Sequence, residues 1–371
     1  MAAPLEGLKV LDLTRVLAGP YATMTLADLG ADVVKVERPE TGDDTRLFGP
    51  PFTQDVSTYF LSINRGKRSI ALDLKSDDGK ATVLALADRA DVVIENFRPG
   101  VMDRLGLGAD TLRARNPRLI YCCISALGRD KPAAGYDVMV QGLSGIPTLT
   151  GDGSVPWKCG ASIADLVSGM NAVQGILAAV VRRERTGQGA LVDVSMLDGQ
   201  LALLTYHASA WLNAQVVPQA WGNQHASIHP YGAYPTATGW LIVAIGNDTL
   251  FEKLCGVLGR DWHTDARFAH NRDRVTHRQA LDALLEPVTR TRPLDAWLAA
   301  LAQAGIPSGP METVPQALER ATLLEHPHPG GQGTVRSCVP GFRLDDAPRG
   351  AADGPPRIGE HGPAILAEWI D

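Results

Sequence analysis

The first half of the chain alternates short apolar runs with amphipathic segments. The apolar runs are rich in Val, Ile and Leu, and they predict buried strands at residues 8–13, 32–37, 69–72, 91–95, 119–124 and 190–195. Between them, apolar positions repeat with the period of a helix, notably at 22–29 and 77–89. Apolar strands that alternate with helices are typical of a parallel sheet covered on both faces, so we predict an α/β fold.

The strongest helical pattern covers residues 165–185. Its apolar residues recur at steps of three or four, which places them on one face: Leu166, Met170, Val173, Leu177, Val180 and Val181. Three arginines between 182 and 185 suit the negative end of the helix dipole, and Gly187 suits a left-handed stop. We therefore expect Asp165 at or next to the N-cap. A further helix is predicted at 196–215.

The composition changes after about residue 218, which indicates a second domain. Residues 221–234 are rich in Gly, His, Pro and aromatic residues and are predicted to form a loop. A strand is predicted at 240–245, and helices at 249–258, 274–290, 294–304 and 361–370. We predict a large domain of residues 1–220 completed by 325–371, and a smaller α/β domain of residues 221–324.

The overall composition is that of a globular protein with a sizeable core. The 371 residues are 45% hydrophobic and 20% charged, and the net charge is −6 without a long basic run, so nothing indicates nucleic acid or a membrane as the partner. The five cysteines form no CxxC pair, and no signal peptide or apolar run of about 20 residues is found. We expect a cytoplasmic location.

The beginning of the chain is similar to a dinucleotide-binding fold. A predicted strand leads into the turn T-R-V-L-A-G-P, and the next strand ends at Glu37, which suits a ribose. The turn has one glycine where the dinucleotide motif has three, which disfavours close approach of a pyrophosphate. A nicotinamide-dependent oxidoreductase therefore stays a second hypothesis.

Other patterns bear on ligands and metals. Cations follow several predicted strands and suit a phosphorylated ligand, although each alone is typical of a solvated surface: Arg15, Arg38, Lys67, Arg68, Lys75, Arg98 and Arg104. His225 and His229 are four residues apart, but Pro230 disfavours a zinc helix, and no metal site is predicted. No G-x-S-x-G motif and no P-loop occurs.

Asp165 has two possible roles on spacing alone. A helix N-cap carboxylate accepts backbone N–H bonds and contributes about 1 kcal/mol. With an ordinary pKa of about 3.9, the carboxylate is also expected to be ionised at pH 7 and able to attack an activated acyl group. Gly160, Ser162 and Gly169 are expected to leave room for a ligand.

Eight motifs together resemble the family III CoA-transferases, which include formyl-CoA transferase and α-methylacyl-CoA racemase. They span the chain in order: L-x-V-L-D-L-T-R-V-L-A-G-P (8–20), L-G-A-D-V-V-K-V-E-R-P (29–39), N-R-G-K-R-S-I-A-L-D-L-K (64–75), A-D-V-V-I-E-N-F-R-P-G (90–100), G-Y-D (135–137), A-D-L-V-S-G (164–169), G-I-P-S-G-P (305–310) and G-E-H (359–361).

The resemblance implies a Rossmann-like large domain, an interlocked homodimer and covalent catalysis. Asp165 would attack an acyl-CoA thioester, form a mixed anhydride and then an aspartyl-CoA thioester. CoA would be a substrate, with no tightly bound cofactor. It would lie against Leu17, Ala18, Arg38, Leu72, Lys75, Asn96, Phe97, Arg104 and Tyr136. A CoA-binding protein without catalysis is the third hypothesis.

Within the family, two segments indicate the substrate group. The racemases have His before the Asp of their G-H-D motif, whereas Tyr136 stands here, which disfavours racemisation. G-D-D-T-R (42–46) and W-G-N-Q-H-A-S-I-H-P-Y (221–231) resemble the succinate–hydroxymethylglutarate CoA-transferases, which implies dicarboxylic acids. The segment 128–137 is shorter than usual in the family. Candidates to bind the distal carboxylate are Arg46, His225, Ser227 and His229.

Overall fold

The computed structural model describes residues 3–345 and 349–371, which divide into two compact units. Unit 1 comprises Met1–Ile146, Lys158–Ser209 and Thr322–Asp371, and unit 2 comprises Pro147–Trp157 and Ala210–Ala321. The segment Pro147–Trp157, which the sequence analysis placed in the large domain, belongs to unit 2. Within that unit the carbonyl of Gly151 accepts a 2.8 Å hydrogen bond from the N–H of Gly222. Such a contact between distant segments leaves no pattern in the sequence.

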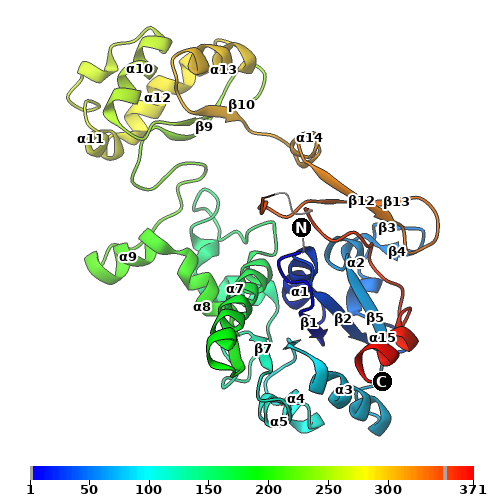
Figure 1. The fold of residues 1–371 in the computed structure, drawn as a ribbon. Coiled ribbons are helices and arrows are strands. Elements are labelled where there is room, and N and C mark those ends of the chain that lie inside the picture. Colours follow the sequence, from blue (N-terminus) through cyan, green and yellow to red (C-terminus); the bar gives the residue numbers. More distant parts are fainter. Residues whose placement is uncertain (1–2, 346–348) are drawn as a thin grey trace. The chain divides into compact units, whose positions relative to one another are not determined.

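Unit 1 is built on a six-stranded sheet in the order β5-β2-β1-β6-β7-β8, with every pair of neighbours parallel (Figure 1). The strands are β1 (Lys9–Asp12), β2 (Asp32–Glu37), β5 (Lys67–Ala71), β6 (Val92–Glu95), β7 (Ile120–Ser125) and β8 (Ala190–Ser195). The prediction of an α/β fold with a parallel sheet is confirmed.

Helices cover both faces of this sheet. Both faces are apolar, because side chains alternate between the two faces along each apolar strand. Val10 packs in one apolar cluster, whereas its neighbour Leu11 packs in the other. Helices α1 (Ala18–Asp28), α6 (Asp137–Ser144), α7 (Ile163–Thr186) and α8 (Met196–Leu203) contribute to the first cluster. Helices α3 (Asp77–Arg89), α4 (Val101–Leu105), α5 (Ala109–Arg115) and α15 (Gly362–Trp369) contribute to the second. A strand buried on both faces reads as a continuous apolar run, as the sequence showed.

Helix α7 begins earlier than the sequence predicted. Ser162 is its N-cap residue, and Gly187 ends it at a φ of 71°. Asp165 therefore lies inside the first turn, and the expectation that it is the N-cap, or next to it, was wrong. The periodic apolar pattern in the sequence starts only at Leu166. The first turn of the helix is buried through the small side chain of Ala164, which was not counted in that pattern.

The sequence analysis found no apolar run of about 20 residues, but α7 is long and apolar enough to meet the criterion for a membrane-spanning helix. By length and composition, α7 is apolar enough to cross a membrane, and among the described residues it is the single helix of this kind. It packs against α1, β7 and β8 in unit 1. This is the position of a core helix, and core helices of soluble proteins meet the same test.

The remaining elements of unit 1 are short. They are η1 (Asp44–Leu47), β3 (Phe52–Thr53), β4 (Val56–Ser57), α2 (Thr58–Ile63), η2 (Ile146–Thr148, which ends in unit 2), β12 (Leu323–Pro327) and β13 (Thr334–Cys338). The predicted helix 196–215 is two helices, α8 and α9 (Thr205–Ala214), since Thr205 has a φ of 38°.

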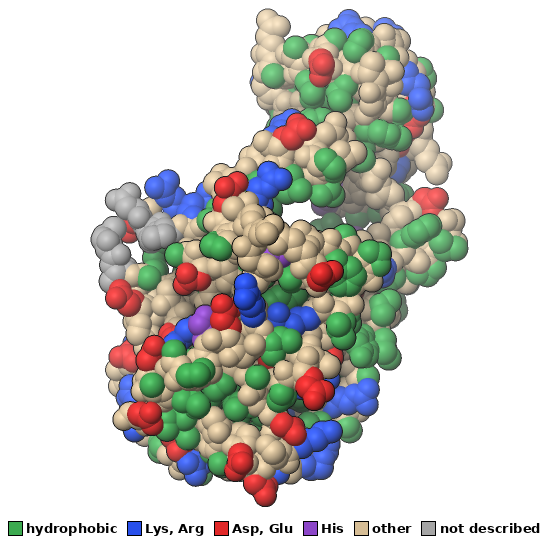
Figure 2. Space-filling model, turned by 90° about the vertical axis from the view of Figure 1, so that its right-hand side faces the viewer, with side chains coloured by type: hydrophobic (Ala, Val, Ile, Leu, Met, Phe, Trp, Pro, Cys, Tyr) green, Lys and Arg blue, Asp and Glu red, His purple; other side chains and the backbone are tan. Residues whose placement is uncertain are grey.

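On the face shown in Figure 2, acidic and basic side chains are interspersed.

Unit 2 has an antiparallel sheet in the order β11-β10-β9, with helices around it. The elements are β9 (Tyr231–Pro235), β10 (Trp240–Ala244), α10 (Asp248–Leu258), η3 (Trp262–Thr264), α11 (Asn271–Thr276), α12 (Arg278–Thr289), α13 (Leu294–Gln303), β11 (Ser308–Pro310) and α14 (Val314–Glu319). The predicted loop 221–234 was wrong at its end, where Tyr234 pairs with Leu241 in the sheet and is buried. The predicted helix 274–290 is broken at His277.

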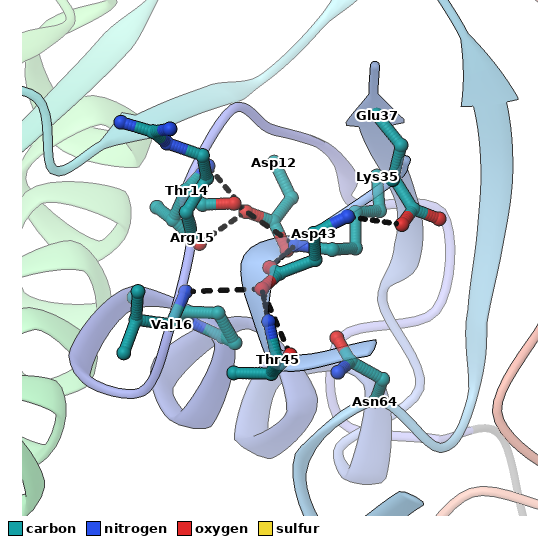
Figure 3. Close-up of polar contacts among 12 residues, drawn as sticks. Asp12, Thr14, Arg15, Val16, Lys35, Glu37, Asp43, Thr45 and Asn64 are labelled. Carbon is teal, nitrogen blue, oxygen red and sulfur yellow. Dashed lines mark hydrogen bonds and ion pairs between the residues drawn. The ribbon is translucent and has the colours of Figure 1, made fainter. Parts of the chain in front are cut away.

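A cluster of buried charges lies at the carboxyl end of β1 and β2 (Figure 3). The ammonium of Lys35 is 2.9 Å from an Asp43 carboxylate oxygen, and the ammonium of Lys67 is 3.2 Å from an Asp12 oxygen. Burial alone would raise the pKa of Asp12, but Lys67 and Lys35 outweigh it and lower that pKa to about 2. The cluster contains three carboxylates and three cations, and their charges balance: Asp12, Glu37 and Asp43 with Lys35, Arg46 and Lys67.

This cluster fixes the backbone conformation of the turn between β1 and α1. The ammonium of Lys35 donates to the carbonyl of Thr14, and the N–H of Val16 donates to Asp43 over 3.3 Å. Asn96 holds Arg15 from the other side, with its amide donating to the Arg15 carbonyl and accepting from the Arg15 N–H. Val16 has a φ of 69°, which costs a β-branched residue roughly 1–3 kcal/mol. The hydrogen bonds hold the turn in this costly conformation.

Removing one cation should therefore destabilise unit 1. We expect Lys35→Met to lower the free energy of unfolding by about 3–5 kcal/mol, because the Asp43 carboxylate is left buried without its partner. Urea unfolding measures this change. Arg115→Met, which breaks the surface ion pair with Asp88, is the matched control and should change stability little. Equal losses in the two variants would contradict the role of the buried pair.

Candidate active site

The order of the strands marks the place where a ligand is expected. From β1 the chain moves to β2 on one side of the sheet and later to β6 on the other, so β1 and β6 are the point where the order reverses. In open α/β sheets, ligands bind outside the carboxyl ends of the strands at this point. The turn 13–17 after β1 and the segment 96–99 after β6 border it here.

Asp165 lies at this place, although it comes from a helix. It lines a cavity of about 50 Å³ together with Ala18 of α1, Ser125 of β7 and the segment after β6. The residues lining the cavity are Ala18, Asn96, Phe97, Arg98, Pro99, Ile124, Ser125, Ala126, Ala133, Gly135, Asp165 and Met196.

Gly169 brings the two helices of the site together. A Cβ atom at Gly169 would lie 2.6 Å from the carbonyl oxygen of Ala18, so only glycine lets α7 approach α1 this closely. Gly169 had been expected to leave room for a ligand, but the structure shows that Ala18 and Tyr21 occupy that space. Its effect is to place Asp165, one turn earlier, beside the start of α1.

The Asp165 carboxylate is mostly buried and has no neutralising partner. Among residues 3–345 and 349–371, none donates a hydrogen bond to it or forms an ion pair with it. Burial, and after it the carboxylate of Asp137, raises its pKa from an ordinary value of 3.8 to about 7. The sequence analysis expected Asp165 to be ionised at pH 7, whereas a pKa of about 7 leaves it only about half ionised there, because burial removes much of its hydration.

Asp137, at the start of α6, fixes the segment in front of Asp165. One of its carboxylate oxygens accepts a 2.9 Å hydrogen bond from the N–H of Ala164, and the other accepts one of 2.8 Å from the amide of Gln141. The amide oxygen of Gln141 in turn accepts from the N–H of Cys159. Asp137 is the last residue of the G-Y-D motif, where the sequence analysis considered only Tyr136. The missed signal was this second aspartate.

Tyr59 of α2 is a further group near Asp165. Burial raises the pKa of its phenol to about 12, and the carboxylates of Asp165 and Asp137 add to this effect. Its ring contacts Phe48 edge to face, with ring centroids 5.6 Å apart. No motif pointed to Tyr59, since α2 lies near Asp165 only in the folded chain.

Comparison with known proteins identifies the family. The family model described as CoA-transferase family III matches residues 5–362. The chain belongs to this family. The resemblance found in the sequence is thereby confirmed, and the protein is an enzyme of the CoA-transferase type.

Its relatives cover the whole chain. The chain is 41% identical to the acetyl-CoA:oxalate CoA-transferase of Acetobacter aceti, over 99% of this chain and 96% of that protein. It is 40% identical to the succinate–glutarate CoA-transferase of Agrobacterium fabrum, over 98% and 95%. Among solved structures, a CAIB/BAIF family protein from Brucella suis is 42% identical, covers both chains completely and has a TM-score of 0.86. CoA thioesters are the substrates of this family.

Four of the positions predicted to contact CoA surround the cavity or its border. Ala18, Asn96 and Phe97 line it, and Leu17 is the N-cap residue of α1. The guanidinium of Arg15 lies 4.9 Å from the centre of the Phe97 ring. The strand order therefore gathers residues that are about 80 positions apart in the chain.

The other five predicted CoA positions lie on neighbouring segments of unit 1. The exposed Arg38 pairs with Asp44, and Leu72 follows β5, its N–H donating to Glu37. Lys75 and Arg104 are exposed, and Tyr136, the N-cap residue of α6, is 62% exposed. Exposed cations can reach a large anionic substrate, and contact with CoA stays a prediction for all nine positions.

The predicted carboxylate-binding residues are divided between the units. Arg46 in unit 1 forms two 2.7 Å hydrogen bonds with Glu37 and a third, of 3.0 Å, with the carbonyl of Pro356. Glu37 is thus held by Arg46 and is not free to bind a ribose, which removes the support for a nicotinamide site. His225, Ser227 and His229 belong to unit 2, where buried His229 lies 3.3 Å from Asp282. Their contact with a substrate stays a prediction.

The raised pKa of Asp165 predicts a stability that depends on pH. The folded state keeps this proton up to about pH 7, whereas the unfolded chain releases it near 3.8, so the cost of folding grows from about pH 4 to 7 and is constant above. We expect Asp165→Asn to raise the free energy of unfolding by about 4 kcal/mol at pH 8, and by less than about 2 kcal/mol at pH 5.

Urea unfolding of both proteins at the two pH values checks this prediction. Asp198→Asn is the matched control, since it removes an exposed carboxylate from the first turn of α8. Its effect should change little between pH 5 and 8. A destabilised Asp165→Asn at pH 8 would show that the carboxylate is paired in solution.

Proposed function

We propose that this enzyme moves CoA between short dicarboxylic acids through a covalent intermediate on Asp165. The observation that carries the proposal is the position of Asp165: a mostly buried carboxylate at the carboxyl end of the sheet, with which none of the described residues forms an ion pair. A carboxylate held in an ion pair is a poorer nucleophile, whereas this one gains from losing its charge. The relatives support dicarboxylic substrates, because their names include succinate, glutarate and oxalate.

The first half of the reaction transfers CoA to the enzyme. The Asp165 carboxylate attacks the thioester carbonyl of the donor, the C–S bond breaks, and CoA leaves as a thiolate with the electron pair. The thiolate then attacks the Asp165 carbonyl of the resulting anhydride. The C–O bond breaks, the donor acid leaves as a carboxylate, and Asp165 is now a thioester of CoA.

The second half transfers CoA to the acceptor. The carboxylate of the acceptor attacks the aspartyl thioester and releases the thiolate, which forms a second anhydride. The thiolate then attacks the acyl carbonyl of the acceptor and restores the Asp165 carboxylate. No step requires a general base, and none of the described residues that line the cavity is a histidine.

A distal carboxylate on the substrate needs cations or several donors. We keep Arg46, His225, Ser227 and His229 as the candidates. The guanidinium of Arg46 has most of its hydrogen bonds within unit 1, so it would act best through a remaining N–H. A panel of mono- and dicarboxylic acceptors decides whether a distal carboxylate is recognised.

The proposal includes a homodimer and a cytoplasmic location. An apolar groove in unit 1 supports association with a second copy, since exposed apolar grooves mark interaction sites. It has a volume of about 1120 Å³, and its lining includes Leu17, Tyr21, Met24, Leu61, Leu166, Met170, Val173 and Phe342. All five cysteines are unpaired, which supports a reducing compartment.

Trapping the intermediate tests the proposed mechanism. We expect that hydroxylamine, added after succinyl-CoA, modifies the protein at Asp165, because it attacks anhydrides and thioesters but leaves carboxylates intact. Peptide mass spectrometry locates the modified residue. Asp165→Asn should lose at least about a thousandfold of the transfer rate. Transfer that persists in Asp165→Asn, with no modification in the unaltered enzyme, would reject the mechanism. Neither transfer nor modification in the unaltered enzyme would instead favour a CoA-binding role.

The ionisation of Asp165 should also govern the rate. Since only the carboxylate attacks, we expect kcat/KM for the acyl-CoA to fall about tenfold per pH unit below about pH 7. Initial rates between pH 5.5 and 8.5 give this profile. A rate independent of pH over that range would contradict the raised pKa in the free enzyme.

A further inference from the structure

Two carboxylates lie at the start of α7, and only one of them is proposed to react. Asp165 is in the first turn, and Asp137 reaches the same turn from α6. A helix start carries a partial positive charge that normally stabilises one nearby anion. Asp137 is the anion that contacts this helix start directly. One of its carboxylate oxygens accepts a hydrogen bond from the N–H of Ala164, the residue directly before Asp165.

The bonds of Asp137 keep its charge in place. Its second oxygen accepts from Gln141, one turn further along α6, and Gln141 also holds the N–H of Cys159. The carboxylate is therefore bonded to the first turn of α7 and, through Gln141, is linked to the segment at Cys159. It cannot turn away from Asp165 without breaking two hydrogen bonds.

We propose that Asp137 is a positioning residue whose fixed negative charge favours the covalent state of Asp165. This inference rests on the proposed function above. The ionised Asp165 is repelled by Asp137, whereas an anhydride or thioester at Asp165 is neutral and is not repelled. When Asp165 attacks the thioester, the new bond to the acyl carbon removes its charge, and the departing thiolate carries that charge away.

Other groups that face Asp165 do not offset this repulsion. Tyr59 of α2 is neutral, since burial raises its pKa to about 12. Arg98, after β6, lines the same cavity, but no ion pair joins it to Asp165 among the described residues. The remaining elements around the cavity present Ala18, Ser125 and Met196, none of which is charged. Asp137 is therefore the charge that acts most directly on Asp165.

The pH midpoint of Asp165 and the ratio of aspartyl-CoA to free enzyme should change together. Protonation and acylation both neutralise Asp165, so the same repulsion favours both equally. Removing the charge of Asp137 should lower the pH midpoint of Asp165 by about one unit. At pH 8 or above, where the free enzyme is mostly ionised, it should then also reduce the equilibrium ratio of aspartyl-CoA to free enzyme about tenfold, because one unit corresponds to a factor of ten.

The test uses Asp137→Asn, in which the amide oxygen can still accept the N–H of Ala164. Carbon NMR of the Asp165 carboxyl group, assigned with Asp165→Asn, gives the midpoint without any substrate. Intact-protein mass spectrometry after equilibration with succinyl-CoA and excess free succinate gives the ratio of adduct to free enzyme. We expect both quantities to fall together in Asp137→Asn, and to recover at least in part in Asp137→Glu.

Two variants separate the charge from the hydrogen bonds. Gln141→Met removes the bonds to Asp137 and Cys159 but keeps the charge, so its midpoint should stay within about 0.3 units of the unaltered enzyme. Asp137→Ser provides a second neutral cap if Asp137→Asn does not fold. A midpoint that falls as far in Gln141→Met as in Asp137→Asn would overturn the proposal in favour of a purely structural role.

The remaining outcomes are equally distinct. An unchanged midpoint in Asp137→Asn, or a lowered midpoint with an unchanged adduct ratio, would overturn the inference and leave the proposed function intact. Failure of the unaltered enzyme to form any adduct would instead overturn the proposed function, and with it the effect of Asp137 on a covalent state of Asp165. The NMR midpoints would still show whether Asp137 acts on Asp165.

Discussion

The buried ion pairs between β1, β2, β5 and the segment after β2 are the constraint on which the site depends. Lys35 forms an ion pair with Asp43 and donates a hydrogen bond to the carbonyl of Thr14. The residues that balance the charge of the cluster therefore also fix the conformation of the turn before α1. Val16 would relax to negative φ without these bonds, and the residues that follow it would move. The turn follows the first strand of the sheet, where a dinucleotide site has its glycine-rich loop, but its conformation is held by ion pairs and hydrogen bonds.

The site is then completed by a helix that comes from far along the chain. Gly169 allows α7 to lie against α1, and Asp137 fixes the segment before Asp165. The carboxylate is left where hydration is poor and a second anion is near, which is a costly place for a charge. The enzyme thus tolerates a local loss of stability at the residue that we propose reacts.

Much of unit 1 could be predicted from the sequence, because strands buried on both faces leave unmistakable apolar runs. The strand that contains Val10 and Leu11 was found in this way, and the helix that carries Asp165 was found from apolar residues repeated at steps of three or four. The family was recognised because its motifs are collinear in the chain. The site was less accessible, since Tyr59 and Asp137 approach Asp165 only through tertiary packing. The pKa of Asp165 depends on burial, which spacing cannot give.

Helix α15 has a consequence for how the chain is made. Its Trp369 is buried in the second cluster of unit 1 and donates to Asp32 of β2, and the N–H of His361 donates to the carbonyl of Ser69 in β5. The edge strand β5 is therefore covered only after residues up to Trp369 have left the ribosome. Until then Ile70 of β5 lacks its neighbours Ile365 and Trp369 of the second cluster. Incompletely packed apolar side chains expose a nascent chain to aggregation and to chaperones.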